Sequence, residues 1–190
     1  MVYEKKKEGR DIKMRKPAFL IMAIFLVSIL AGCYESHIPL STSRYAVINK
    51  KLVGYWVSVP EAKDEKKIFL AIFKFNENEY LVSWREGEDD TTLARGFITK
   101  IDNTNIMNVQ NIKSLEKDDR SYVFFKYDFT DHDDLRVHIL SGETSLLKNK
   151  KFKSSKEFYS YIKKNLGNDE LFGKAVIFKP AKKIGLEIIP

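Results

Sequence analysis

Residues 121–141, SYVFFKYDFTDHDDLRVHILS, contain the clearest structural pattern in this chain of 190 residues. Apolar side chains fall on alternate positions, first at Val123, Phe125, Tyr127 and Phe129 and then at Leu135, Val137 and Ile139. A period of two is typical of a β-strand that buries one face. The polar residues between the two runs have the composition of a hairpin turn. The stretch therefore predicts two antiparallel strands, residues 121–129 and 134–141.

The rest of the chain after residue 48 repeats this pattern of aromatic and β-branched runs separated by Asn, Asp and Gly. Turns at residues 76–78 and 102–104 and an acidic loop at residues 86–92 connect successive runs. Such spacing predicts an antiparallel meander. The further strands are expected at residues 52–58, 67–75, 79–85, 93–101, 105–112 and 173–179. Residues 184–189 are either an additional edge segment or a tail.

One helix is expected before the last strand. Ser154 and Glu157 have the spacing of a capping box, and Gly167 suits a helix end. Apolar residues recur with helical spacing at Phe158, Tyr161, Ile162 and Leu166. Residues 68–73, IFLAIF, are apolar on both faces, so we expect this helix to cover the outer face of that strand. The predicted fold is mainly β, an antiparallel up-and-down meander or barrel of about eight strands with one C-terminal α-helix before the last strand.

The N-terminal region has the parts of a secretion signal. Basic residues 14–16 precede thirteen apolar residues, 18–30, which are followed by the small residues Ala31 and Gly32. A membrane-spanning helix needs roughly 18 or more apolar residues, so a cleavable signal is the better interpretation. An ordinary secretory signal or a buried helix with a chance cysteine is the alternative. Translation from Met1 or from Met14 stays open.

The residues Leu30-Ala31-Gly32-Cys33 resemble the lipobox of bacterial lipoproteins. The resemblance implies that the Cys33 thiol receives a diacylglycerol and that the chain is cut just before it. The chain then divides into a signal peptide (residues 1–32), a lipidated tether (33–48) and a β domain (49–190). In such lipoproteins, Asp directly after the lipidated Cys implies retention at the inner membrane. Here that residue is Tyr34, which implies a place at the outer membrane, facing the periplasm, if the organism has two membranes. The expected partner is the membrane, through lipid on Cys33.

Positive charge is concentrated near the C-terminus of the chain. Residues 148–190 contain eleven Lys and four acidic residues. They could contact anionic headgroups or an acidic partner, although a solvated lysine-rich face is the simpler alternative. Nucleic acid is not an expected partner of an exported protein. Cys33 is the only cysteine, so a disulfide within the chain is excluded.

The first predicted strand opens with Gly54-Tyr55-Trp56, a G-x-W motif. This motif, with the order of strands, helix and closing strand, resembles the lipocalin-like (calycin) barrels. The resemblance implies that Trp56 closes one end of the barrel and that Gly54 lets the chain pass close beneath it. A core Trp in an unrelated β-sandwich or half-barrel is the alternative.

A barrel of about eight strands is either filled by side chains or holds one small ligand. Candidate ligand-lining residues are Tyr80, Trp84, Phe97, Phe125 and Tyr127. Aromatics on alternating strand positions are more often plain core. We therefore expect a membrane-anchored, non-enzymatic lipoprotein that binds a small apolar ligand or lipid at the cell envelope. The alternative is a structural lipoprotein whose filled barrel docks an envelope protein.

No metal, other cofactor or catalytic residue is expected. An acidic cluster is formed by Asp128, Asp131, His132, Asp133 and Asp134. Its spacing does not match an EF-hand loop, so a polar hairpin turn is the better interpretation. The histidines lie in the predicted tether (His37), in that turn (His132) and on the outward face of a strand (His138). The common hydrolase, metalloprotease and phosphate-loop motifs are absent from the sequence.

Overall fold

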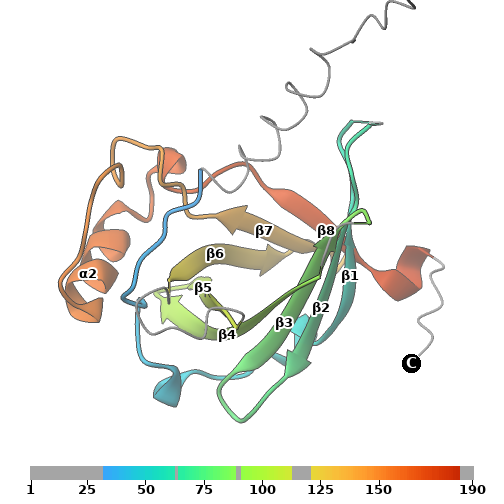
Figure 1. The fold of residues 1–190 in the computed structure, drawn as a ribbon, viewed down its shortest axis with the longest axis horizontal. Coiled ribbons are helices and arrows are strands. Elements are labelled where there is room, and N and C mark those ends of the chain that lie inside the picture. The colour runs from blue at the N-terminus through green and yellow to red at the C-terminus, as the bar shows by residue number, and fades with distance from the viewer. Residues whose placement is uncertain (1–31, 63, 89–90, 113–120, 185–190) are drawn as a thin grey trace, which may run out of the picture. The chain divides into compact units, whose positions relative to one another are not determined.

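The computed structural model describes residues 32–184, except residues 63, 89–90 and 113–120. Eight strands form a closed antiparallel barrel in which β8 pairs with β1 (Figure 1). The strands are β1 (Gly54–Ser58), β2 (Ile68–Lys74), β3 (Tyr80–Glu86), β4 (Thr92–Ile101), β5 (Thr104–Asn111), β6 (Tyr122–Phe129), β7 (Leu135–Ile139) and β8 (Val176–Pro180). Helix α2 (Ser155–Asn165) precedes β8. The predicted fold class is confirmed. The signal peptide up to residue 31 and the tail from residue 185 lie outside the described residues.

The turns form where the sequence predicts them, because polar side chains satisfy the backbone there. The Asn76 side chain accepts hydrogen bonds from the N–H groups of Asn78 and Glu79, both at 2.9 Å. Asp102 takes a positive φ of 51° between β4 and β5. Asx turns and left-handed residues of this kind favour tight connections between antiparallel strands. These short connections explain why β2 pairs with β3 and β4 pairs with β5.

Alternate residues of every strand point into the barrel and form an inner core. This cluster of buried side chains consists of Leu52, Trp56, Ile72, Tyr80, Val82, Ala94, Ile98, Met107, Val109, Tyr127, Leu135 and Phe178. The β6 residues follow the predicted alternation, since Tyr127 is inward whereas Phe124 packs on the outer face. The barrel therefore has an apolar interior separated from its outer surface by one layer of sheet.

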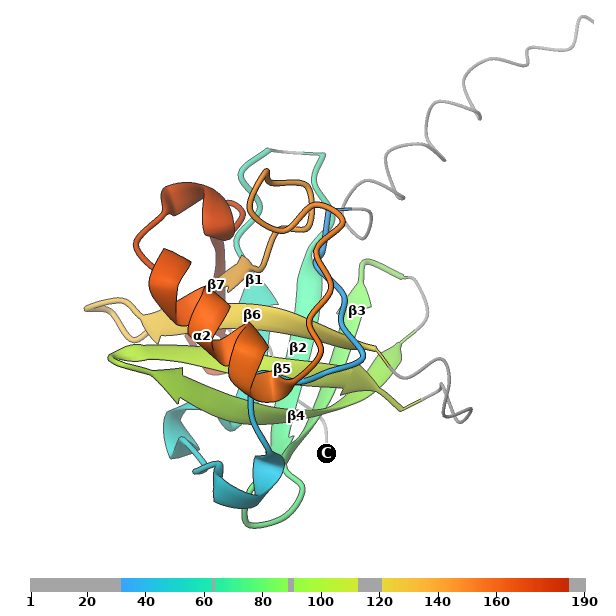
Figure 2. The ribbon, with the colours of Figure 1, turned by 90° about the vertical axis from the view of Figure 1, so that its left-hand side faces the viewer.

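A second core lies on the outer surface of the barrel, between β4–β6 and α2 (Figure 2). Phe158 of α2 packs on Phe124 of β6, with ring centroids 5.0 Å apart, and stacks on Phe152 at 4.5 Å. Ile101 of β4 and Ile106 of β5 belong to the same buried cluster. The predicted N-cap is confirmed, since the Ser154 side chain accepts a hydrogen bond from the Glu157 N–H at 3.2 Å.

The expectation that α2 covers the outer face of residues 68–73 is wrong. The outward side chains of β4–β6 with which α2 packs are large, and they combine with aromatic residues before the helix into one buried cluster. On β2, Phe69 and Ala71 stay half-buried and Phe73 is exposed. Burial of apolar area favours the larger cluster, so β2 keeps an apolar outer face.

The segment expected as a tether, residues 33–48, is part of the folded domain. Its backbone pairs with the barrel, because the Tyr34 N–H donates to the Leu140 carbonyl at 2.9 Å. Ser36 and Tyr122 exchange two backbone hydrogen bonds of 3.1 and 2.8 Å. The side chains of Tyr34 and Leu40 are buried in the second core. The Ser- and Pro-containing composition did not predict this packing, which depends on only a few apolar anchors.

We predict that Leu40→Ala lowers the free energy of unfolding by roughly 2–5 kcal/mol, as for other fully buried leucines. Leu40 is 1% exposed. Val47→Ala is the matched control in the same segment, because Val47 is 76% exposed. Its effect should stay within about 0.5 kcal/mol. Urea unfolding of both variants measures the difference, and equal small effects would mean that the segment does not belong to the fold.

Candidate functional site

One end of the barrel is sealed by the turn before β1. A short 3₁₀ helix, η2 (Lys50–Leu52), places Leu52 in the inner core at 1% exposure. The indole N–H of Trp56 donates to the Leu52 carbonyl at 2.9 Å, and its ring lies 6.0 Å from that of Phe129. We call this the sealed end. Trp56 thus lies next to the chain that closes the barrel.

Gly54 is required here by its backbone conformation. Its φ of +147° is one that L side chains rarely adopt. No heavy atom outside its immediate neighbours lies within 4 Å of the position that a Cβ would take. Conformation, and not the close passage implied by the lipocalin resemblance, therefore accounts for the glycine.

Asn49 binds the two tyrosines at the bottom of the sealed end. Its N–H donates to the Tyr80 hydroxyl at 2.6 Å, and its side-chain amide donates to the Tyr127 hydroxyl at 3.5 Å. Burial raises the pKa of Tyr80 to about 12 and also raises the pKa of Tyr127. Both phenols therefore stay protonated and uncharged, and the polar atoms at the sealed end already have protein partners.

The interior surface toward the opposite end of the barrel is apolar and only half-buried. Starts of even-numbered strands and ends of odd-numbered strands meet at this end, because the barrel is an up-and-down meander. The inward residues that keep solvent exposure there are Ile68, Leu70, Trp84, Val123, Phe125, Val137 and Val176. We call this set the apolar mouth. These side chains pack against the inner core, and each keeps part of its surface exposed to solvent. Two other half-buried side chains that pack against the inner core, Ile48 and Phe129, lie toward the sealed end.

The five candidate ligand-lining residues separate into three places. Trp84 and Phe125 belong to the apolar mouth, whereas Tyr80 and Tyr127 lie at the sealed end. Side chains alternate between the two faces of a strand, and on β4 Ala94 and Ile98 point inward. Phe97 therefore points to the outer face. Its ring instead lies 6.3 Å from that of Tyr122. The aliphatic mouth residues were not predicted as lining residues, although the alternation of their strands was available to find them.

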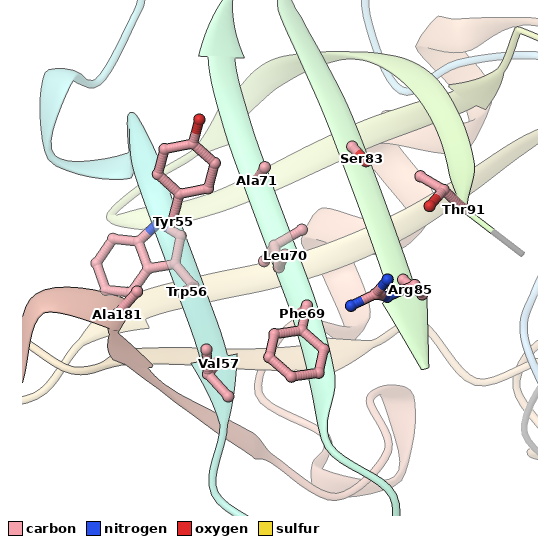
Figure 3. Close-up of a pocket in the computed structure, with 10 residues that line it drawn as sticks. All are labelled: Tyr55, Trp56, Val57, Phe69, Leu70, Ala71, Ser83, Arg85, Thr91 and Ala181. Atoms are coloured by element: carbon pink, nitrogen blue, oxygen red, sulfur yellow. The ribbon is translucent and has the colours of Figure 1, made fainter. Parts of the chain in front are cut away.

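A second hollow lies on the outer face of β1–β3 (Figure 3). The small residues Ala71 and Ser83 are directly paired in the sheet and form its floor. Tyr55 and Phe69 stand beside them, and the Arg85 guanidinium lies 5.3 Å from the centroid of the Phe69 ring. The groove has a volume of about 290 Å³. The groove stays uncovered because α2 packs on β4–β6.

The acidic cluster forms a hairpin turn between β6 and β7. The Thr130 hydroxyl accepts hydrogen bonds from the backbone of His132 and Asp134. Asp128 pairs with Arg136 at 2.7 Å and Asp133 pairs with Lys51 at 3.3 Å, so these two carboxylates face different cations. Within the described ranges, no three His, Cys, Asp or Glu residues gather as metal ligands would.

The other two histidines lie apart from this turn. His138 is on the outer face of β7, with its Nδ1 atom 3.0 Å from the Gly173 carbonyl oxygen. His37 is exposed in the segment before β1.

Cys33 lies beside the end of β7, at the same end of the barrel as the apolar mouth. It forms an antiparallel bridge with Ser141, and Ser36 bridges Tyr122 at the start of β6. The thiol is half-buried, and burial, with the nearby Glu35 carboxylate, raises its pKa. The thiol form is therefore favoured over the thiolate.

The helices of the described part of the chain are all too short or too polar to cross a membrane.

Comparisons of this chain with protein-family models, with curated proteins and with solved structures find no match. The eight-stranded barrel is consistent with a lipocalin-like fold.

We predict that Trp56→Ala lowers the free energy of unfolding by roughly 3–5 kcal/mol, as expected when a buried Trp is truncated. Trp56 is 6% exposed and donates the hydrogen bond that holds Leu52. Trp84→Ala is the matched control, because Trp84 is half-buried. Its effect should be clearly smaller. Denaturant unfolding compares the two, and a near-neutral Trp56→Ala would contradict a role in closing the barrel.

Proposed function

We propose that this protein is a lipid-anchored, non-enzymatic protein of a bacterial cell envelope whose barrel binds a small apolar ligand or lipid. The observation that carries the proposal is the apolar mouth. Its side chains point into the barrel and keep solvent exposure, while the sealed end is filled and closed. Removing such surface from water is worth about 25 cal/mol per Å², so an apolar ligand is the class that this surface favours.

The position of Cys33 supports anchoring. Two or more acyl chains are needed for stable membrane attachment, and a diacylglyceryl cysteine supplies them. The half-buried Cys33 lies at the mouth end of the barrel. An anchor there would bring the apolar mouth close to the bilayer, where apolar ligands are most concentrated.

The groove on β1–β3 supports a second candidate, docking of an envelope protein. Tyr55 and Phe73 are exposed large apolar residues of this face, in edge-to-face contact at 5.3 Å. Arg85 at its rim lies over the Phe69 ring, whereas Arg95 on the same sheet face is paired with Glu79 at 2.5 Å. An apolar segment with a carboxylate placed to pair with Arg85 would fit this face.

The lipid anchor is tested by Cys33→Ser. The substitution removes the thiol that would be acylated, so we expect complete loss of acylation and an unprocessed precursor. Mass spectrometry of the N-terminal peptide and the apparent size of the membrane-recovered protein measure both effects. A processed, membrane-bound Cys33→Ser protein would contradict the lipobox interpretation.

Ligand binding is tested by displacement of a fluorescent fatty acid from residues 34–190. We expect saturable displacement by amphiphiles, weakened roughly tenfold by Phe125→Ala, since the lost contact is worth about 1–2 kcal/mol. Tyr55→Ala, on the outer groove, is the control and should leave displacement unchanged. If Tyr55→Ala weakened displacement instead, the ligand would lie in the outer groove. No displacement by any amphiphile would remove the ligand-binding proposal and leave the docking candidate.

A further inference from the structure

We propose that four lysines between β7 and α2 bind the anionic headgroups of the membrane in which Cys33 is anchored. We call Lys148, Lys150, Lys151 and Lys153 the lysine loop. This contact depends on the proposed anchoring of Cys33, and it adds to that proposal a membrane-binding surface and a fixed orientation of the barrel.

The lysine loop is bonded directly to the chain around Cys33. The Tyr34 hydroxyl donates to the Lys150 carbonyl at 2.8 Å, and the backbone of Cys33 bridges Ser141 ahead of the loop. The Tyr34 ring also contacts Phe152, with centroids 6.2 Å apart. Figure 2 shows the N-terminal segment and the segment before α2 running side by side. Acyl chains on Cys33 would therefore hold the lysine loop near the headgroup layer without a linker.

The charge of this surface fits an anionic bilayer. All four lysines are exposed, and none of them forms an ion pair with a carboxylate of the described residues. The Lys150 ammonium lies 4.2 Å from the centroid of the Tyr161 ring, which leaves its outer side to solvent. Three exposed carboxylates share the region, those of Glu35, Glu143 and Glu157. A lysine near an anionic membrane contributes about 1 kcal/mol, or about a fivefold gain in contact.

The location of the loop favours lipid over an acidic protein as its partner. A protein could dock on any face, whereas a bilayer must lie at the anchored residue. Cys33 bridges Ser141 just past the end of β7, at the mouth end of the barrel, and the lysine loop follows Ser141 in the chain and is bonded to Tyr34. Headgroup contact would therefore turn the apolar mouth toward the bilayer and give apolar ligands a short path into it.

The test uses the mature, acylated protein, residues 33–190, in vesicles that contain phosphatidylglycerol. Cys33 is the only cysteine, and once acylated it does not react with maleimides. Ser145→Cys then carries a single fluorophore in the segment of the lysine loop, and Asp131→Cys carries one at the sealed end. Both positions are exposed. A lipid with a nitroxide on its headgroup quenches fluorophores that lie near the headgroup layer.

We expect severalfold stronger quenching at position 145 than at position 131. Replacing the four loop lysines by Gln should lower the quenching at position 145 severalfold. A matched set of sealed-end substitutions should leave it unchanged: Lys50→Gln, Lys74→Gln, Lys100→Gln and Lys182→Gln. In vesicles of phosphatidylcholine alone, the quenching at position 145 should fall as much as it does with the loop substitutions.

Equal quenching at the two positions, or quenching at position 145 that the loop substitutions do not change, would overturn the proposal. Mass spectrometry of the same samples shows whether the anchoring proposal or the headgroup proposal has failed. A chain without acyl groups contradicts the anchoring itself. An acylated chain whose position 145 stays unquenched contradicts only the headgroup contact.

Discussion

Pairing of β1 with β8 is the constraint on which the rest of this structure depends. Trp56, Val57 and Ser58 pair with residues of β8 while they also belong to the strand that pairs with β2. This pairing closes the sheet, so each of the eight described strands has a partner on both sides. It also creates an inside and an outside from sequences that are apolar on both faces. The sealed end, the apolar mouth and the outer groove all follow from that separation.

The two ends of the barrel have different chemical characters for local reasons. At the sealed end, η2 places Leu52 under Trp56, and Asn49 satisfies the tyrosine hydroxyls. At the mouth, the inward residues are apolar but are not covered to the same degree. A barrel filled by side chains to both ends has no volume for a ligand, so binding would depend on the less covered apolar side chains at the mouth.

The sequence predicted the elements well and their packing less well. Alternation at Val123, Phe125 and Tyr127 indicated the strands and the inward face, and Ser154 marked the start of the helix. The position of α2 could not be predicted, since its apolar stripe fits any apolar strand face and the choice depends on contacts distant in sequence. The packing of residues 33–48 was missed for the same reason. Phe97 was misplaced because aromatic character alone does not give the register of a strand.

Quenching of the two tryptophans by brominated fatty acids tests the central claim, that the barrel has an accessible apolar mouth and a sealed end. The chain contains only Trp56 and Trp84. Trp56→Phe leaves the mouth tryptophan as the single reporter, and Trp84→Phe leaves the one at the sealed end. Our account predicts saturable quenching of Trp84 and little quenching of Trp56. Equal quenching of both, or quenching of neither at saturating fatty acid, would contradict it.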